Sequence, residues 1–304
     1  MLDICLSGTG GTLPQTDRWL TSLMVRCNGH AALIDCGEGT QIALQKAGQN
    51  LSPIDIILIT HIHADHISGL PGLLLTMGKM GRTEPVTIIG PVGTEHIVNS
   101  LRCIAPFLTF ELTVRELEAE ETLLSFQNCE LKAFAVEHDL PCLGYSFSLP
   151  RAGKFDAARA KELGVPMPLW KRLQKGESIE QDGRTYTPDM VMGAPRRGLK
   201  VTYCTDSRPL PSIAAAAAGS DLFICEGMYG DNEKLDKAEQ NKHMLFSEAA
   251  QMAAQAGGVK ELWLTHYSPS MPNPEDYLGV ARAIFPNTHT PKDGWCKTLV
   301  FDEA

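Results

Sequence analysis

The sequence predicts an α/β protein in which two β-rich halves stack as a sandwich with helices on the outside. Short apolar runs rich in β-branched residues alternate with helical segments in both halves of the chain. The 304 residues, of which 43% are hydrophobic, are enough to bury a core of this size. Between the halves, residues 151–200 lose strand periodicity and become rich in basic residues, proline and glycine. We therefore expect one domain over 1–304, interrupted by an inserted arm at 151–200.

The first half begins with strands. An alternating opening strand runs into the glycine turn of "GTGG". Two strands joined at Asn28-Gly29 come next, because a type I′ turn needs residues that tolerate positive φ at both central positions. A helix over Thr40–Ala47 is stopped by Gly48, and the continuous apolar run Ile54–Thr60 predicts a strand buried on both faces.

The later elements alternate in the same way. Helices are expected at 72–80 and 94–103, and strands at 86–91, 108–118, 121–138 and 143–150. The inserted segment carries signals for one helix and one small hairpin. The second half should contain a strand ending at Asp206, a helix stopped by Gly219, a buried strand up to Gly227, a helix over 247–257 and a strand ending at His266.

The N-terminus, "MLDICLSGTGG", has neither the basic region nor the apolar stretch of a signal peptide. No run approaches the roughly 20 apolar residues that cross a bilayer. The nine cysteines include no Cys-x-x-Cys pair, and Cys36, Cys204 and Cys225 lie in apolar strand-like runs. These features favour a cytoplasmic protein without membrane contact, whose thiols are buried and reduced.

The net charge of −9 argues against a nucleic-acid partner until its distribution is considered. Residues 151–200 hold 11 Lys+Arg against 6 Asp+Glu, and the rest of the chain holds 16 against 30, so the two balances are +5 and −14. An acidic body with one basic segment favours a polyanion contact confined to that segment. From charge alone, a solvated surface loop explains the segment equally well.

The densest group of potential metal ligands lies in "THIHADHISG" at 60–69, directly after the apolar run. Crowding His61, His63, Asp65 and His66 together without a cation is costly, so this spacing favours a metal site. The four ligands are too many for one zinc ion with an open position and too few for two ions.

Three distant residues complete the count. His138, Asp206 and His266 each follow a predicted strand, and strand ends at one edge of a sandwich converge. Taken singly, the two histidines are equally consistent with a structural role. Imidazole and carboxylate ligands suit zinc, manganese or iron. The ligands then divide between two ions, bridged by Asp206 and a water or hydroxide: His61, His63 and His138 for one ion, and Asp65, His66 and His266 for the other.

The extended ligand segment, "THIHADHISGLPGLL", resembles the signature of the metallo-β-lactamase superfamily and, within it, of the ribonuclease Z family. The resemblance covers nearly the whole chain. The extension "GLPGLL", the segment "DCGEGTQ" and the basic Pro-Gly-rich insert are more specific to that family than the ligand core is. Further matching segments are "GTGG", "VEHDLPCLGY", "GVPMPLW", "CTDSRP", "CEGMY", "KHMLFSEAA" and "LTHYSP".

This resemblance implies a metallo-β-lactamase-type αββα sandwich with a basic exosite arm and two Zn²⁺ per subunit, with Mn²⁺ or Fe²⁺ as alternatives. It implies endonucleolytic cleavage of precursor tRNA after the discriminator nucleotide, with Asp65 taking a proton from the attacking water. By the same matching, His243 is the general acid at the leaving oxygen, Glu226 is its partner, and Asp35 orients a ligand imidazole. Without the family, Asp35 and Glu226 are interpreted equally well as carboxylates bonded to backbone.

The resemblance also implies a role for the arm. In the family, the arm grips the tRNA elbow, and the enzyme is a homodimer in which one subunit's arm holds the tRNA presented to the other subunit's site. Such contacts to phosphate position a nucleic acid without reading its sequence. The implied contacts here are six basic residues: Lys154, Arg159, Lys161, Lys171, Arg172 and Lys175.

The chain departs from the family pattern in four segments. "MPLW" at 167–170 replaces Gly-Pro-Leu-Trp, and "CTDSRP" at 204–209 replaces Ser-Gly-Asp-Thr-Arg-Pro. "CEGM" at 225–228 replaces His-Glu-Ala-Thr, and Arg18-Trp19 occupies the position of a common Arg-Asn pair. None of these changes removes a metal ligand. The Arg18-Trp19 difference bears on how the enzyme treats precursors that already encode the 3′-terminal CCA.

Two other functions fit parts of the pattern. A hydrolase of small phosphodiesters or (thio)esters uses the same two-metal site, but a small ester needs no distant basic segment. A non-catalytic RNA-binding protein with this fold is expected to have lost metal ligands, whereas all seven are present. The nuclease is therefore the favoured function.

Overall fold

The computed structural model describes residues 1–118 and 122–302. The chain divides into two compact units. The first comprises Met1–Ser148 and Leu199–Ala304, and we call it the body. The second comprises Leu149–Gly198, and we call it the arm unit.

The first sheet of the body has seven strands in the order β16-β1-β2-β3-β4-β5-β6. Neighbours from β16 to β3 pair antiparallel, and those from β3 to β6 pair in parallel. Asn28 and Gly29 have φ values of 52° and 86°, which confirms the predicted tight hairpin. The strands are β1 (Leu2–Gly8), β2 (Ser22–Cys27), β3 (His30–Ile34), β4 (Ile54–Leu58), β5 (Val86–Pro91), β6 (Leu112–Leu117) and β16 (Trp295–Leu299).

The second sheet also has seven strands, in the order β15-β14-β13-β12-β9-β8-β7. Strands β12 to β15 pair in parallel, so their carboxyl ends lie at one edge of the sheet. We predicted a strand over 121–138. Its first residue, Glu121, lies outside the described residues. The strands are β7 (Thr122–Phe126), β8 (Cys129–Val136), β9 (Cys142–Arg151), β12 (Arg196–Cys204), β13 (Leu222–Glu226), β14 (Leu262–Thr265) and β15 (Thr288–His289).

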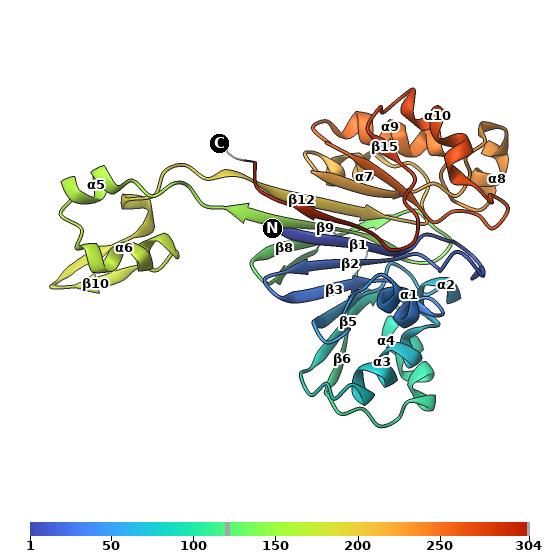
Figure 1. Ribbon diagram of the computed structural model, residues 1–304, viewed down its shortest axis with the longest axis horizontal. Helices are drawn as coiled ribbons and strands as arrows, with labels where there is room; N and C mark the ends of the chain where they lie inside the picture. Colours follow the sequence, from blue (N-terminus) through green and yellow to red (C-terminus); the bar gives the residue numbers. More distant parts are fainter. Residues whose placement is uncertain (119–121, 303–304) are drawn as a thin grey trace. The chain divides into compact units, whose positions relative to one another are not determined.

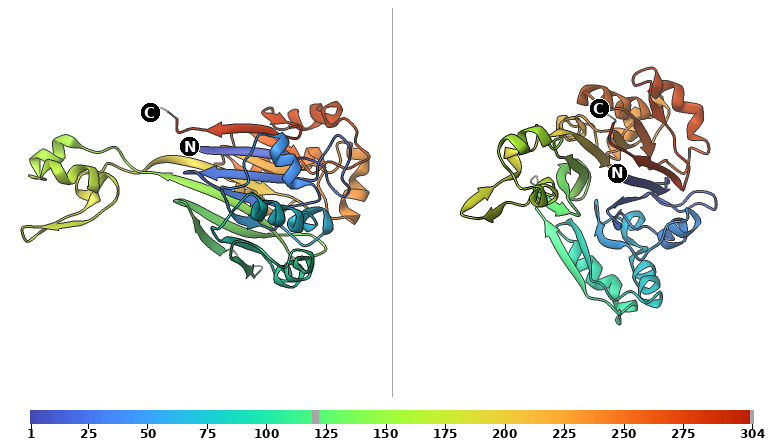
Figure 2. Two further views of the ribbon diagram at one scale, coloured as in Figure 1. Left: turned by 60° about the horizontal axis from the view of Figure 1, so that its bottom comes forward. Right: turned by 60° about the vertical axis from the view of Figure 1, so that its left-hand side comes forward.

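Helices cover the outer face of each sheet, as Figures 1 and 2 show. Those beside the first sheet are α1 (Thr40–Lys46), α2 (Ala64–Ile67), α3 (Leu70–Lys79) and α4 (Thr94–Leu101). Those beside the second are α7 (Pro211–Ala217), α8 (Leu235–Gln240), α9 (Phe246–Ala256) and α10 (Leu278–Arg282). Short 3₁₀ turns cover Arg102–Ile104, Pro188–Met190, Asn232–Lys234 and Pro274–Tyr277.

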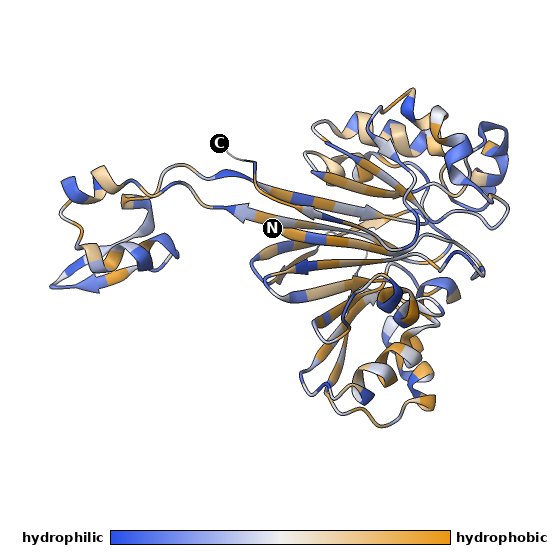
Figure 3. Cartoon of the chain, viewed as in Figure 1, coloured by the Kyte–Doolittle hydropathy of each residue, from blue (hydrophilic) through white to orange (hydrophobic). Residues whose placement is uncertain are grey.

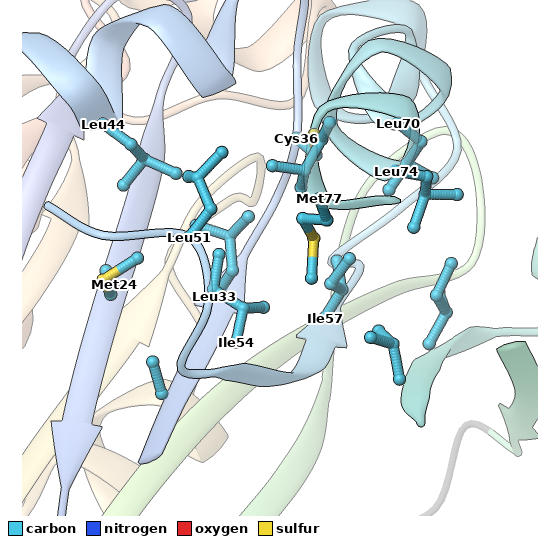
Figure 4. Close-up of a cluster of buried hydrophobic side chains, with 14 of the residues drawn as sticks. Met24, Leu33, Cys36, Leu44, Leu51, Ile54, Ile57, Leu70, Leu74 and Met77 are labelled. Atoms are coloured by element: carbon cyan, nitrogen blue, oxygen red, sulfur yellow. The ribbon is translucent and has the colours of Figure 1, made fainter. Parts of the chain in front are cut away.

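Apolar packing joins each helix layer to its sheet. Leu70, Leu74 and Met77 of α3 pack against Ile54 and Ile57 of β4 in the cluster drawn in Figure 4. A second cluster joins α7, α9 and α10 to β13 and β14. Hydrophobic residues recur along the strands of both sheets (Figure 3), as burial on both faces requires.

The two sheets are joined across the middle of the body by buried polar contacts. The Tyr145 hydroxyl on β9 donates to the Ile59 carbonyl after β4 at 2.7 Å. Thr21 and Thr265 share a hydroxyl hydrogen bond of 2.8 Å. The predicted sandwich of two sheets with outer helices is therefore confirmed.

The arm unit has its own small apolar core, in which Leu169, Leu173 and Tyr186 are buried. We predicted one helix and one hairpin for this segment, and the hairpin is present as β10 (Ile179–Gln181) and β11 (Arg184–Tyr186). The single helix was wrong, because Gly164 at φ 65° separates two helices. They are α5 (Ala157–Glu162), whose first turn is capped by Asp156, and α6 (Met167–Gln174).

The expectation of nine reduced, buried thiols was wrong for three cysteines. Cys5 and Cys296 lie opposite each other on the antiparallel pair β1 and β16, and the structure records a disulfide between them. The pairing of the C-terminal strand with the N-terminal one was not predicted. Cys103 is an exposed thiol, whereas the other six free cysteines are buried.

Within residues 1–118 and 122–302, no helix has both the length and the apolar character needed to cross a bilayer.

Candidate metal centre

Seven His and Asp side chains from four strand ends converge in the body. His61 and His63 follow β4, and α2 then carries Asp65 and His66. His138 follows β8, whereas Asp206 and His266 follow the parallel strands β12 and β14. We call these seven residues the metal centre. The residues predicted to be ligands therefore lie just past strand ends or in the short helix that follows one.

The first group of the metal centre consists of three histidines. His61 Nε2 lies 2.9 Å from His63 Nδ1, which in turn lies 3.2 Å from His138 Nε2. All three ligand atoms fall within 4.8 Å of one another. This group can hold one metal ion.

The second group contains two histidines and one carboxylate. The Nε2 atoms of His66 and His266 lie 3.2 Å apart, and Asp65 Oδ2 lies 3.5 Å from each of them. The Thr12 backbone N–H donates to the same carboxylate oxygen at 2.7 Å. This group can hold a second ion, with the orientation of Asp65 set by the first loop of the chain.

Asp206 lies between the two groups and turns one oxygen toward each. Its Oδ2 is 3.7 Å from His61 Nε2 and 3.9 Å from His138 Nε2. Its Oδ1 is 3.4 Å from His66 Nε2 and 3.3 Å from His266 Nε2. A carboxylate in this position can bridge two ions.

The spacing of the ligand atoms is compatible with a bound metal. Imidazole nitrogens face one another at 2.9 to 3.2 Å in both groups. Two nitrogens bound to one tetrahedral zinc at about 2.0–2.1 Å lie roughly 3.3 Å apart. The spacing is therefore close to that expected around a shared cation.

The protonation states agree with this interpretation. Burial opposes the charge of Asp206, but the surrounding imidazoles, His266 foremost, hold the pKa of that carboxyl well below its usual range. Burial also opposes a charge on His66, yet the neighbouring carboxylates raise its pKa well above the usual value. Burial lowers the pKa of His61 and of His138, which favours the neutral form that binds metals. The buried carboxylates thus supply negative charge that a cation would neutralise, and in its absence the same charge favours a proton on His66.

Unusual backbone geometry accompanies the convergence. Asp35, Asp206 and His266 have φ values of 60°, 52° and 58°, in the left-handed region that costs energy for residues other than glycine. At Gly11, a Cβ atom would lie 2.7 Å from the His266 ring. The absence of a side chain there lets the first loop approach the metal centre closely.

Asp35, at the end of β3, is fully buried behind the ligands. Its Oδ2 lies 2.8 Å from His66 Nδ1, and its Oδ1 accepts from the Thr60 backbone N–H at 2.8 Å. The bond to Nδ1 leaves His66 Nε2 facing the centre, since it sets both the tautomer and the ring orientation.

We expect Asp35→Asn to weaken metal binding by about 10–100-fold, because the amide cannot support the His66 imidazole with a charge. The apparent dissociation constant, measured by competition with a chelator, reports the change. Asp55→Asn is the matched control, since Asp55 also contacts a histidine, His30, but lies outside the metal centre. Equal metal affinity in the wild type and Asp35→Asn would remove this role from Asp35.

His243 and Glu226 lie together beside the metal centre. Glu226, the last residue of β13, is fully buried, and its Oε2 lies 3.0 Å from His243 Nδ1. Its Oε1 accepts from the Ser207 backbone N–H at 2.5 Å. Burial acts to lower the pKa of His243, but Glu226 outweighs it and raises the pKa to about 9. His243 Nδ1 is 3.8 Å from Asp206 Oδ2, so a protonated imidazole lies next to the ligands.

A cavity of about 580 Å³ opens onto the metal centre and His243. Its walls include residues to which the sequence analysis assigned no role: Thr12, Tyr229, Lys237, Asn241, Ser268 and Ser270. Thr12 follows "GTGG", which was noted only as a match. The others lie in loops and a short helix whose place beside the centre depends on the fold.

The six basic residues expected to contact phosphate all lie in the arm unit and are all exposed. Arg159 and Lys161 are on α5, whereas Lys171 and Arg172 are on α6. Arg172 also pairs with Glu177 at 2.7 Å. None of them belongs to the metal centre.

Comparison with known proteins agrees with this architecture. Residues 2–144 match a family model described as Anti-Pycsar protein Apyc1, over less than half of the chain. The crystal structure of human tRNase Z, short form, aligns with a TM-score of 0.71 and 23% identity over 98% of this chain and 100% of its own. The metallo-β-lactamase fold protein YhfI from Bacillus subtilis aligns with a TM-score of 0.70 and 17% identity over 97% and 98% of the two chains.

Full-length sequence relatives are more similar. Ribonuclease Z of Agathobacter rectalis is 57% identical over 303 residues, covering 100% of both chains. Ribonuclease Z of Lachnospira eligens is also 57% identical, covering 100% of this chain and 99% of its own. The two sheets and the outer helices define a protein of the metallo-β-lactamase fold, whose His/Asp centre could hold divalent metal ions. Within that class, the full-length identities show that the chain belongs to the ribonuclease Z family.

Proposed function

We propose that this protein is a metal-dependent endoribonuclease that removes 3′ trailers from precursor tRNA by cutting after the discriminator nucleotide. The observation that carries the proposal is the His243–Glu226 pair beside two complete ligand groups, in a chain that matches ribonuclease Z over its full length. We propose zinc for both ions, with manganese or iron as alternatives. When bound, such a pair lowers the pKa of a shared water and neutralises a phosphoryl oxygen.

The protein's own residues prepare the attacking water and the substrate geometry. The three histidines of the first group and the three ligands of the second would hold one ion each, with Asp206 between them. Asp65 is placed to take a proton from the attacking water, and the N–H of Thr12 restricts its rotation. We propose that the scissile phosphodiester enters the cavity beside the centre.

His243 supplies the proton that the leaving oxygen needs. A ribose alkoxide is strongly basic, so protonation as the P–O bond breaks accelerates cleavage. Because Glu226 occupies Nδ1, the Nε2–H of the imidazolium is the one left to reach the leaving oxygen. The negative charge of Glu226 also favours the protonated form of the ring.

The arm unit would hold the rest of the tRNA. The six exposed basic residues named above suit contacts to phosphates, which position a substrate without reading its sequence. We propose that the protein acts in the cytoplasm as a homodimer in which each arm unit presents tRNA to the other subunit.

The decisive experiment incubates the metal-loaded protein with a 3′-extended tRNA precursor and maps the cut, with and without an encoded CCA. We expect one cut after the discriminator nucleotide. His243→Ala should slow it roughly 100- to 10,000-fold, as removal of a general acid does, while the metal content stays the same. A wild-type protein that leaves the precursor intact would refute the function, and metal loss in His243→Ala would make His243 a ligand instead.

A further inference from the structure

Arg208, two residues after Asp206, forms a two-pronged ion pair with Glu248 of α9. Its Nη2 lies 2.5 Å from Glu248 Oε1, and its Nη1 lies 3.0 Å from Glu248 Oε2. Only 16% and 15% of the two side chains are exposed. Paired hydrogen bonds of this kind fix a guanidinium in one orientation, which a single point contact does not do.

The same guanidinium also holds the main chain of His243. Arg208 Nη1 donates to the His243 carbonyl oxygen at 2.5 Å. His243 lies in the connection between α8 and α9, directly after Lys242, which has a φ of 53°. The Glu226 bond restrains its ring, and the Arg208 bond restrains the backbone from which that ring extends.

Glu248 connects this restraint to helix α9, whose inner face is buried. Its Oε2 accepts from the Leu245 backbone N–H at 2.8 Å and so caps the start of α9. Phe246 and Ala249 of that helix are fully buried in the core of the body. The connection carrying His243 is therefore anchored to a rigid element at its C-terminal side.

The segment Asp206-Ser207-Arg208 links the catalytic groups to one another. The Ser207 N–H donates to Glu226, and the Arg208 N–H donates to the carbonyl of Glu137, the residue before His138. One three-residue segment thus supplies the bridging carboxylate, the support for Glu226 and the clamp on the His243 main chain.

We propose that Arg208, held by Glu248, is a positioning residue that aims His243 Nε2 at the leaving oxygen. This inference rests on the proposed role of His243 as general acid. Proton transfer requires the donor within hydrogen-bond reach, and a displacement of about 1 Å can cost roughly 100-fold in rate. Arg208 itself does not touch the substrate.

The test uses substrates that differ in their need for a proton. An RNA phosphodiester needs a general acid, whereas bis(p-nitrophenyl) phosphate releases a stable anion without one. We expect Arg208→Lys to lower kcat on precursor tRNA about 10–100-fold with KM and metal content unchanged, and to lower the rate on the nitrophenyl diester by at most about threefold. In a His243→Ala background, Arg208→Lys should cause no further loss on RNA, because residues that act through one group are not additive.

Two further variants separate positioning from stability. Glu248→Gln keeps an oxygen for the Leu245 N–H but loses the ion pair, so it should show the same dependence on the leaving group. Arg82→Lys is the matched control: Arg82 is a buried arginine that pairs with Asp55 and bonds to backbone carbonyls away from the metal centre. We expect it to leave both activities at the wild-type level.

Equal slowing of the RNA and nitrophenyl reactions by Arg208→Lys, or additive loss in the His243→Ala background, would overturn the inference and make the ion pair merely structural. Failure of the wild type to cut precursor tRNA would refute the proposed function instead. In that case the positioning role is tested by comparing the rates on phenyl and p-nitrophenyl diesters. Phenolate is the more basic leaving group, so its departure is the one that a proton accelerates. Arg208→Lys must slow the phenyl ester more, and equal slowing again overturns the inference.

Discussion

Asp206→Ala is expected to abolish metal binding and, with it, hydrolysis of RNA and of small diesters alike. Asp206 faces both ligand groups: its Oδ1 lies 3.3 to 3.4 Å from His266 and His66, and its Oδ2 lies 3.7 to 3.9 Å from His61 and His138. Without Asp206, the buried histidines of both groups lose the neighbouring carboxylate whose negative charge balances that of a bound cation. We expect a loss of at least about 1,000-fold in kcat, beyond the 10–100-fold that removal of an outer partner costs.

Metal content per chain and the rate on bis(p-nitrophenyl) phosphate together check this result. Asp221→Asn is the matched control, because Asp221 is also buried, pairs with Lys260 at 3.0 Å, and lies before β13, at the opposite end of that strand from Glu226. The control should retain both metal and activity. An Asp206→Ala protein with full metal content would show that the two ligand groups are independent of the bridge.

Deletion of the arm is expected to abolish cleavage of precursor tRNA while hydrolysis of a small diester continues. Gly153 and Gly193 are the place to cut. A Cβ at Gly153 would lie 1.9 Å from the Gly193 carbonyl oxygen, so the two backbones touch there. Replacing residues 154–192 with Asn-Gly therefore closes the chain with a tight turn. Among the described residues, the two apolar clusters that join the helices to the sheets include none from the arm unit, so the body should stay folded.

A second variant tests whether charge accounts for the effect. Changing the six basic residues expected to contact phosphate to glutamine keeps the arm unit's apolar core and the Trp170 bond to the Val165 carbonyl. We expect KM for precursor tRNA to rise about 10–100-fold, with kcat nearly unchanged and a shallower dependence on salt. Equal loss of RNA and small-diester activity on arm deletion would contradict the separation of substrate grip from chemistry.

The local backbone conformation was predictable from the sequence wherever a few neighbouring residues determine it. The Asn28-Gly29 hairpin depends only on two residues that tolerate positive φ, and strand β5 was predicted at its observed bounds. Several short or non-local elements were missed. Helix α2 has four residues, too few for a periodic pattern, although it carries Asp65 and His66.

Non-local pairing accounts for the other differences. Strand β16 joins β1 from the far end of the chain, so no pattern within either segment indicates the pairing. The Cys5–Cys296 disulfide follows from that pairing and was missed with it. The bonds from Thr12 to Asp65 and from Arg208 to His243 likewise connect loops that only the folded body brings together.

By itself, the sequence determined the kinds of side chain available for chemistry: three histidines and an aspartate in one short segment, and three more ligands that each follow a strand. Ligand type and local spacing are properties of the chain, so they can be read without coordinates. Only the tertiary structure decided that Asp206 turns one oxygen to each ligand group, that Asp35 supports His66, and that Arg208 clamps His243. Those relations depend on distances between segments far apart in the chain, which the packing of two sheets establishes.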